Sequence, residues 1–433
     1  MKTFFFFVFV FACQSVFSQT SLGDELENYN ENLNTITTAV PFLTISPDSR
    51  SGAMGDVGAA TSPDVHSIHW NSAKLAFLPS GGSFSISYTP WLSKLVPDIS
   101  LSHITGYYKL NEISAVAAGM RYFSLGNIQF TNDQGEYVGE YDPNEYVFDL
   151  AYSMKLSDNF SAGLVMKYIY SNLTGGIFVE GLQTEAGKSF AVDLGTYYQS
   201  KTFEISGYDS QWALGLNISN IGSKISYTES GDEDFLPMNL RLGSRVSMEI
   251  DDYNEIMFAL DINKLLVPTP PVYAIDSDGQ PVDINGNPVQ LGSPEHHILA
   301  GQNPNVGIVQ GIFQSFSDAP GGLEEEINEL MYSFGAEYWY DNQFAFRFGY
   351  FHEHENKGNR KYFTLGSSLK LNVFEIDFAY LIPANSSVRS PLENTMRFSL
   401  VFNLDSFNSE NLFKSNRQKS EIRNNQFNTP NLK

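Results

Sequence analysis

The sequence predicts an all-β fold, a 14-stranded antiparallel transmembrane β-barrel with an N-terminal hatch. Three observations support this prediction. In the stretch 344–350 every second residue is a large aromatic, and Arg347 lies on the opposite face of the same strand. Many other stretches repeat this alternation, and short and long connections alternate between them. Aromatic residues make up 14% of the chain, as expected where rings form girdles at both membrane interfaces.

Length and charge narrow the possible functions. A chain of 433 residues is long enough for one large barrel or for two or three soluble domains. The formal net charge of −23 argues against nucleic acid as a partner, and against docking on an anionic membrane surface.

Residues 1–18 are predicted to be a signal peptide, because Lys2 precedes an apolar run over 4–12 and a small residue stands at Ser18. The only cysteine, Cys13, lies inside this segment. Lipidation of Cys13 in a lipoprotein signal is the alternative, although Phe11 fits a lipobox poorly. The mature chain then has neither a disulfide nor a reactive thiol.

Residues 19–82 are predicted to form a periplasmic lead-in and the hatch. The part over 19–48 is polar and acidic, and we expect it to be loose. The part over 49–79 is rich in small residues and shows no strand alternation, which suits a compact plug that packs closely against the inside of a barrel. The alternative is an ordinary glycine-rich loop. The residues that mark the hatch are Arg50, Gly52, Gly55, Asp56, Trp70 and Asn71.

The barrel is predicted over 83–404, since alternation recurs from Ser83 onward. Fourteen strands is an even number, and most of these strands are close to the length that a tilted strand needs to cross a bilayer. The predicted strands are 83–91, 99–110, 113–124, 146–156, 160–171, 188–199, 210–219, 238–250, 254–264, 332–340, 343–352, 360–371, 374–382 and 394–404.

The connections provide a second test. Every second connection is a short turn, apart from a longer one near 200–209, whereas the others are long. A barrel with both termini in the periplasm requires this pattern, and a soluble sandwich does not. The predicted long connections are 125–145, 172–187, 220–237, 265–331, 353–359 and 383–393.

Charged residues on the strands are predicted to face the lumen in two nearly balanced groups. A near-neutral lumen with cross-strand pairs is a packed interior, not a strongly ion-selective pore. The basic group is Arg121, Lys155, Lys167, Arg241, Arg245, Arg347, Lys370 and Arg397. The acidic group is Asp149, Asp193, Glu249, Asp261, Glu337, Glu375 and Asp377.

The outer loop 265–331 is too long to be a passive connection. It contains two similar turn units, over 275–282 and 284–289, and two candidate short helices, over 306–316 and 323–330. Such a loop suggests a protein partner or a lid; a decorative insertion is the alternative. After it, the polar tail 405–433 is predicted to be disordered.

No motif predicts catalysis, a cofactor or a metal. In the segment 352–355 two histidines alternate with two glutamates, but the spacing is not that of a helical zinc protease motif. Asp276-Ser277-Asp278-Gly279 begins like a calcium loop and then fails, because Pro281 stands where the turn glycine belongs. His296-His297 has no partner at an informative spacing. The sequence has no G-x-S-x-G elbow that would indicate a nucleophilic serine.

The segments 49–64, 69–77 and 87–92 resemble the PorV proteins (also called LptO) of the type IX secretion system of Bacteroidota. These proteins are a branch of the FadL-like barrels, the long-chain fatty acid transporter fold. In many members proline follows the Trp-Asn pair, whereas here Ser72 follows it. The strand pattern extends the resemblance, less specifically, over nearly all of the mature chain.

The resemblance implies a non-enzymatic outer-membrane protein. Such a protein binds the C-terminal signal domain of secreted cargo at the giant translocon barrel SprA (Sov), and passes the cargo to the attachment complex that contains the sortase PorU. The name LptO reflects a proposed link to lipopolysaccharide deacylation, for which this sequence supplies no catalytic group. The wall would contact outer-membrane lipids. Candidate partner-binding anchors on the outer loop are Ile308, Ile312, Phe313 and Phe316.

Two competing functions remain open at this point. Uptake of hydrophobic small molecules, as in the fatty acid transporters, predicts an apolar channel past the hatch and a gap in the wall. A structural barrel or adhesin would have surface loops without a partner.

Overall fold

The computed structural model describes residues 33–404, apart from 80, 93–97, 132–136, 177, 180–181, 229–232, 277, 291, 294 and 385–394. The predicted signal peptide, Cys13 and the predicted tail 405–433 lie outside the described residues, as does most of the predicted loop 383–393.

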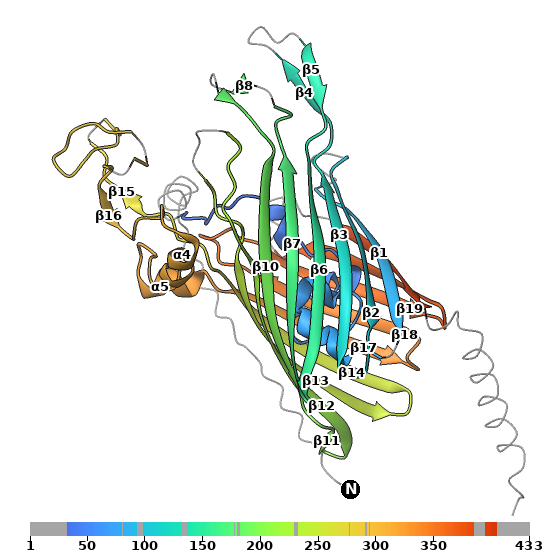
Figure 1. The fold of residues 1–433 in the computed structure, drawn as a ribbon. Coiled ribbons are helices and arrows are strands. Elements are labelled where there is room, and N and C mark those ends of the chain that lie inside the picture. Colours follow the sequence, from blue (N-terminus) through green and yellow to red (C-terminus); the bar gives the residue numbers. More distant parts are fainter. Residues whose placement is uncertain are drawn as a thin grey trace, which may run out of the picture.

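Fourteen long strands form one closed antiparallel barrel (Figure 1). Consecutive strands pair along the sheet, β1 pairs with β21, and β10 pairs with β12, which closes the ring. The fourteen strands are β1 (Gly82–Pro90), β2 (Ser100–Lys109), β3 (Ser114–Ser124), β6 (Asn144–Ser157), β7 (Phe160–Asn172), β10 (Gly187–Gln199), β12 (Tyr208–Gly222), β13 (Asn239–Asp251), β14 (Asn254–Leu265), β17 (Met331–Tyr340), β18 (Phe344–His352), β19 (Lys361–Lys370), β20 (Phe374–Pro383) and β21 (Met396–Asn403). The predicted 14-stranded fold is therefore confirmed.

Side-chain burial on β18 shows which face of the wall is outside. Phe344, Phe346 and Phe348 are 47%, 63% and 41% exposed, whereas Ala345 and Arg347 are 1% and 3% exposed. A surface of large aromatic and aliphatic side chains around a buried polar interior is the arrangement of a membrane barrel. The aromatic face of β18 is accordingly the lipid face.

The two ends of the barrel differ, as the connection lengths predict. One end, here the short-turn end, carries tight turns and the small strand β11 (Phe203–Ile205). The other, here the long-loop end, carries two hairpins that rise from it and the outer loop (Figure 1). The short strands at the long-loop end are β4 (Ile128–Thr131), β5 (Tyr137–Tyr141), β8 (Phe178–Val179), β9 (Leu182–Gln183), β15 (Val272–Tyr273) and β16 (Ile298–Ala300).

Two helices form in the outer loop, as predicted. They are α4 (Ile308–Gln314) and α5 (Leu323–Asn328), and α5 begins with Glu324, Glu325 and Glu326 in its first turn, where acidic residues suit the helix dipole. Both turn units are present: Ile275 bridges to Pro281, and Val282 bridges to Pro288.

The residues before β1 run through the lumen, and Figure 1 shows their blue helices inside the ring of strands. We call residues 39–78 the inner segment. Its helical turns are η1 (Pro41–Thr44), α2 (Ser49–Gly52), α3 (Ser67–Trp70) and η2 (Ser72–Phe77). Most of its side chains are buried, among them Trp70 and Lys74.

The described part of the lead-in differs from the loose, periplasmic segment that the sequence predicts, because it is held at the long-loop end and not beside the short turns. Asn34 donates its backbone N–H to Asn356 at 3.0 Å, and Ala39 donates to Phe235 at 2.9 Å. Both acceptors belong to connections at the long-loop end. The physical reason is hydrophobic burial. Val40, Phe42 and Leu43 pack in an apolar cluster with side chains of the wall such as Leu101 and Phe123. The chain thus runs from the long-loop end, through the lumen, to β1.

Candidate functional site

Asp48 links two helical turns of the inner segment. One carboxylate oxygen caps α2 by accepting the N–H of Ser51 at 2.9 Å, and the other accepts the indole N–H of Trp70 at 2.7 Å. This one side chain therefore joins α2 to α3.

At three glycines of the inner segment a side chain would meet a close neighbour. A Cβ on Gly58 would lie 2.2 Å from the Trp70 ring. Gly55 has φ +67°, and a Cβ there would lie 2.6 Å from the carbonyl oxygen of Tyr350. At Gly52 the neighbour is the Arg397 side chain, 2.7 Å away. Glycine at 52 and 55 lets the inner segment lie directly against β21 and β18, and glycine at 58 lets it fold tightly onto Trp70.

Arg50 joins the inner segment to the wall through a chain of buried charges. Its guanidinium donates to Glu337 at 2.8 and 3.0 Å and lies 2.7 Å from Asp64. Glu337 also accepts from Arg347 at 2.6 Å, and Arg347 donates to Asp377 at 2.6 Å. Breaking such a buried pair by removing one partner typically costs about 3–5 kcal/mol. These charges alternate in sign, so the charge of each group is opposed by its neighbour.

Asn71 and Asp261 hold the middle of the inner segment. The Asn71 side chain donates to the carbonyls of Ala59 at 3.0 Å and Thr196 at 2.9 Å. The Asp261 carboxylate accepts the N–H groups of Gly58 at 2.7 Å and Ala59 at 2.9 Å. The buried backbone groups of Gly58 and Ala59, which lie between helical turns, are thus paired with Asp261 of the wall and Asn71 of the segment itself.

Asp56 lies nearer the long-loop end. It accepts a hydrogen bond from the Tyr362 hydroxyl at 2.6 Å, and one of its oxygens lies 3.9 Å from Arg397. The structure therefore brings Arg50, Gly52, Gly55, Asp56, Trp70 and Asn71 together inside the barrel, each in contact with strands or with its own segment.

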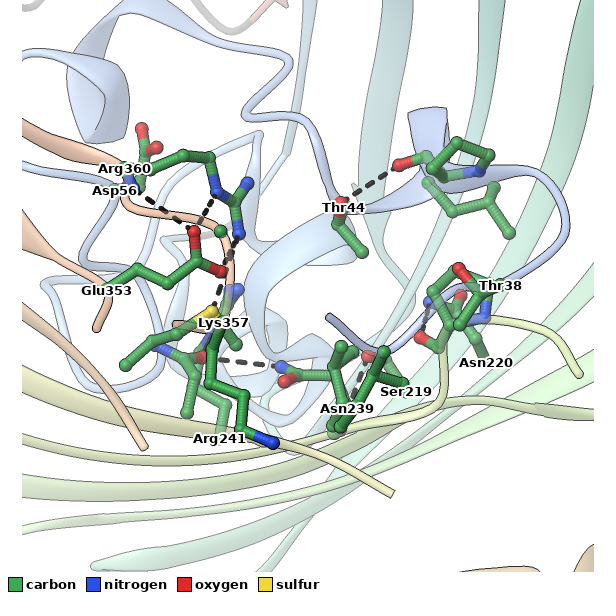
Figure 2. Close-up of a pocket in the computed structure, with 18 of the residues that line it drawn as sticks. Thr38, Thr44, Asp56, Ser219, Asn220, Asn239, Arg241, Glu353, Lys357 and Arg360 are labelled. Atoms are coloured by element: carbon green, nitrogen blue, oxygen red, sulfur yellow. Dashed lines mark hydrogen bonds and ion pairs between the residues drawn. The ribbon is translucent and has the colours of Figure 1, made fainter. Parts of the chain in front are cut away.

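A cavity of about 280 Å³ lies between the inner segment and the long-loop end. Figure 2 shows Glu353 and Arg360 on one side of it and Asn220, Asn239 and Ser219 on the other. Its volume is at the lower limit of common ligand sites, about 300 Å³. Its lining mixes charged groups with Leu43, Leu265 and other apolar residues, so it is not an apolar channel.

Most charges around this cavity are paired. Lys167 lies 2.7 Å from Asp193, Lys357 lies 3.0 Å from Glu329, and Arg360 lies 2.8 Å from Glu353. Among the described residues, Arg241 has no carboxylate within 4.0 Å; its guanidinium lies over the Trp70 ring, 4.5 Å from the centroid. Of the lumenal charges that the sequence predicts, Lys167 and Asp193 form one of these pairs, and Arg121 with Asp149 at 3.6 Å forms another.

The outer loop is fastened to the barrel by a buried network of ions. Lys264 lies 3.0 Å from Glu326 and 2.5 Å from Glu329, and Lys357 lies 2.5 Å from Glu325 and 3.0 Å from Glu329. Because three of these groups belong to α5 or directly follow it, the helix is tied to both β14 and the connection after β18.

Burial raises the pKa of Asp318, which lies between α4 and α5, to about 6. Glu326 and Glu329 add to this effect because their negative charges disfavour ionisation of a third carboxyl group. The same carboxyl group accepts the N–H of Thr269 at 3.1 Å. Asp318 is therefore a titratable member of the network that holds the loop.

The four predicted anchors do not share one face of α4. Ile308 and Ile312 pack against Phe235, Met238, Leu266 and Val267, and hence support the helix. Phe313 is 73% exposed on α4, and Phe316, just after the helix, is 49% exposed and lies near Lys264. Sequence reasoning missed three other exposed apolar residues of this loop, Val309, Leu323 and Ile327, at 68%, 77% and 52% exposure. The spacing of Val309 and Phe313, four residues apart on a helix, was the available signal.

The other candidate ligand groups have local roles. Glu353 is paired with Arg360, and Asp276 accepts the N–H groups of Asp278 and Gln280 within a turn. Within the described ranges, no three His, Cys, Asp or Glu side chains gather closely enough to hold a metal ion. Of the described helices, none is long and apolar enough to cross a membrane.

A closed antiparallel barrel with an apolar outer wall and a charged, occupied lumen defines the class: this is an integral outer-membrane β-barrel protein. The family model described as "Type IX secretion system protein PorV" matches residues 28–272. The chain belongs to this family. It is accordingly an outer-membrane component of type IX secretion. No curated protein matched the chain.

Several solved barrels are similar in outline. The toluene transporter TbuX of Ralstonia pickettii is 14% identical, with a TM-score of 0.44, over 84% of this chain and 98% of that chain. The toluene transporter TodX of Pseudomonas putida is 11% identical, with a TM-score of 0.44, over 82% and 96%. A FadL homologue of Pseudomonas aeruginosa is 10% identical, with a TM-score of 0.39, over 85% and 98%. At these identities and TM-scores, the names of these proteins say nothing about what this chain binds.

Proposed function

We propose that this protein is a non-enzymatic docking component of the type IX secretion system. It binds the C-terminal signal domain of secreted cargo at an SprA (Sov)-type translocon barrel, and it passes the cargo to a PorU-type sortase attachment complex. The long-loop end faces the cell exterior in this proposal, and the short turns face the periplasm. Membership in the PorV family supports a role in type IX secretion. The exposed apolar side chains of the outer loop support the docking role.

The observation that carries the proposal is the exposed apolar surface of the outer loop, made by Val309, Phe313 and Phe316 on and just after α4, and by Leu323 and Ile327 on α5. Large side chains that remain exposed on a fastened helix mark a binding surface more often than chance exposure does. Ile308 and Ile312 serve this surface by packing beneath α4, and the buried pairs of Lys264 and Lys357 hold α5.

The inner segment acts as the hatch in this proposal. The charge chain through Arg50, together with the close contacts of Gly52 and Gly55, keeps it packed against the wall. Asp56, Trp70 and Asn71 secure its later part. A lumen filled at mid-depth by ion pairs suits a docking protein better than an uptake channel, which requires an apolar passage.

Deleting 306–316 tests the proposal. We expect co-purification with the translocon barrel to be lost, while the barrel still migrates as a folded, heat-modifiable band. A milder variant, Phe313→Ser, should weaken recovery about tenfold if Phe313 is a hot spot worth about 1.4 kcal/mol or more. Ile284→Ser is the matched control, since Ile284 is 76% exposed in the same loop but lies in a turn unit. Unchanged co-purification after the deletion would sink the proposal.

A further inference from the structure

Lys264 shows on which side of the barrel wall α5 lies. On β14 the odd-numbered residues Met257, Ala259, Asp261 and Asn263 are 0–4% exposed and face the lumen, so Lys264 faces outward. Its ammonium group is nevertheless buried, because Glu326 and Glu329 pair with it. The end of the outer loop therefore covers the outside of the wall, and Figure 1 shows α4 and α5 beside the barrel, below the tips of the β4–β5 and β8 segments.

A groove of about 320 Å³ separates α5 from this wall. Phe316, Ile327 and Leu330 line it from the outer loop, and Leu240, Leu242 and Ile262 line it from β13 and β14. Leu242 pairs with Ile262 in the sheet, and the lining of both walls is mainly aliphatic. The aliphatic part of the groove thus continues the lipid-facing surface of the barrel, and the paired Lys264 and Glu326 also line it.

The depth of the groove can be estimated from the strand. Ile262 is the ninth residue of β14 counted from Asn254 at the short-turn end. A tilted strand crosses the hydrocarbon region in about 9–11 residues, so Ile262 lies within the crossing length, toward the long-loop end. A groove beside it is reached by lipid chains rather than by bulk water.

We propose that α4 and α5 lie in the membrane leaflet at the long-loop end, and that the groove holds the hydrocarbon chain of a bilayer lipid. The exposed residues Phe313, Leu323 and Ile327 then contact lipid, as an interfacial amphipathic surface does, wherever no docked protein partner covers them. The ion pairs of Lys264 hold the helices at this depth, so a lysine on the lipid face of the wall is never left unpaired. This inference does not depend on the proposed secretion function.

Nitroxide labels test the immersion of the helices. Single cysteines replace Ile327 and Phe313, with Leu260→Cys as the lipid-facing reference and Asn285→Cys as the aqueous reference. Each purified, refolded protein is placed in phosphatidylcholine vesicles that contain no other protein. Labels at Ile327 and Phe313 should be more accessible to oxygen than to a water-soluble nickel chelate, as at Leu260. Accessibility like that at Asn285 would overturn the proposal.

A phosphatidylcholine with a photoreactive acyl chain tests occupancy of the groove. Cross-links should map to peptides that contain Ile327 or Leu242. Leu330→Trp, which fills the groove, should reduce the cross-link at Ile327 at least fivefold and leave the one at Leu260 unchanged. Equal cross-linking in both proteins would show that the chain lies outside the groove and would contradict the proposal. These tests use no translocon. Their failure would therefore contradict the lipid proposal and leave the docking proposal untouched.

Discussion

Glu337 joins the inner segment to the wall of the barrel. It lies on β17 and accepts hydrogen bonds from Arg50 of the inner segment and Arg347 of β18. Alternating charges of this kind stabilise a barrel only while each partner is present, since a buried charge without a partner is costly.

We expect Glu337→Gln to lower the free energy of unfolding by about 3 kcal/mol, because two buried guanidinium groups then share too few carboxylates. Urea unfolding of the purified barrel in detergent measures this change. Glu249→Gln is the control, since Glu249 is exposed on β13. Equal unfolding midpoints for the two variants would show that the charge chain does not stabilise the fold.

Gly58→Ala tests the close packing of the inner segment. The new Cβ meets the Trp70 ring at 2.2 Å, so the ring or the backbone has to shift. Overpacking of this kind costs about 1–3 kcal/mol, and we expect a lower unfolding midpoint or faster proteolysis within the inner segment. Gly307→Ala is the matched control, since nothing lies within 4 Å of a Cβ at that position. A midpoint and proteolysis rate equal to those of the control would contradict the packing described here.

At the scale of elements, a period of two in the sequence identifies the strands well. All fourteen predicted strands are present, with ends that differ by at most three residues. Alternation is reliable here because lipid outside and a polar lumen inside impose opposite demands on neighbouring residues. Both helices of the outer loop were also predicted, the first from the apolar run 306–316 and the second from the three glutamates at the start of 323–330.

Three-dimensional contacts between distant segments could not be predicted in this way. The alternation on β14 places Lys264 on the outer face, but nothing in the local pattern shows that α5 covers it, or that Ile308 and Ile312 face the barrel while Phe313 does not. For the same reason the sequence predicts a loose lead-in, although Ala39, Val40, Phe42 and Leu43 are buried against the wall. Tertiary burial decides these cases, and it depends on residues that are distant in the chain, such as Glu329 for Lys264 and Phe235 for Ile308.

The outer loop should be held more tightly at pH 5 than at pH 7.5. In the folded protein the pKa of Asp318 is raised from 3.8 to about 6, chiefly by burial. A raised carboxyl pKa contributes stability that is fully present below the unfolded value and is lost as pH rises through about 6. The network's Glu325 has a lowered pKa, because pairing with Lys357 outweighs burial, and it stays ionised across this window.

Hydrogen exchange over 315–322, corrected for intrinsic rates, measures this effect. Protection should fall between pH 5 and 7.5 in the natural sequence and stay nearly constant in Asp318→Asn, whose amide oxygen still accepts from Thr269. The same fall in both proteins would mean that another group controls the loop.

At the scale of the whole molecule, the chain runs through its own barrel. It lies against the long-loop connections at Asn34, fills the lumen, and reaches β1 at the short-turn end. The two ends of the barrel are thereby linked by one buried segment. This arrangement gives the proposed docking surface a rigid support.

Surface labelling of intact cells tests the proposed orientation. Cysteines introduced at Asn285 and Leu33, which are both exposed, should react with a membrane-impermeant maleimide, because both lie toward the long-loop end. A cysteine at Asp252, in the turn between β13 and β14, should react only after lysis. Labelling of Asp252→Cys alone in intact cells would show that the barrel has the opposite orientation.

The most direct test of the central claim is a pull-down of the tagged, full-length protein from native membranes, with the bound proteins identified by mass spectrometry. The proposed docking role predicts recovery of a very large translocon barrel together with secreted proteins that carry C-terminal signal domains, and loss of both after deletion of 306–316. Recovery of the intact barrel without either class of partner would contradict it.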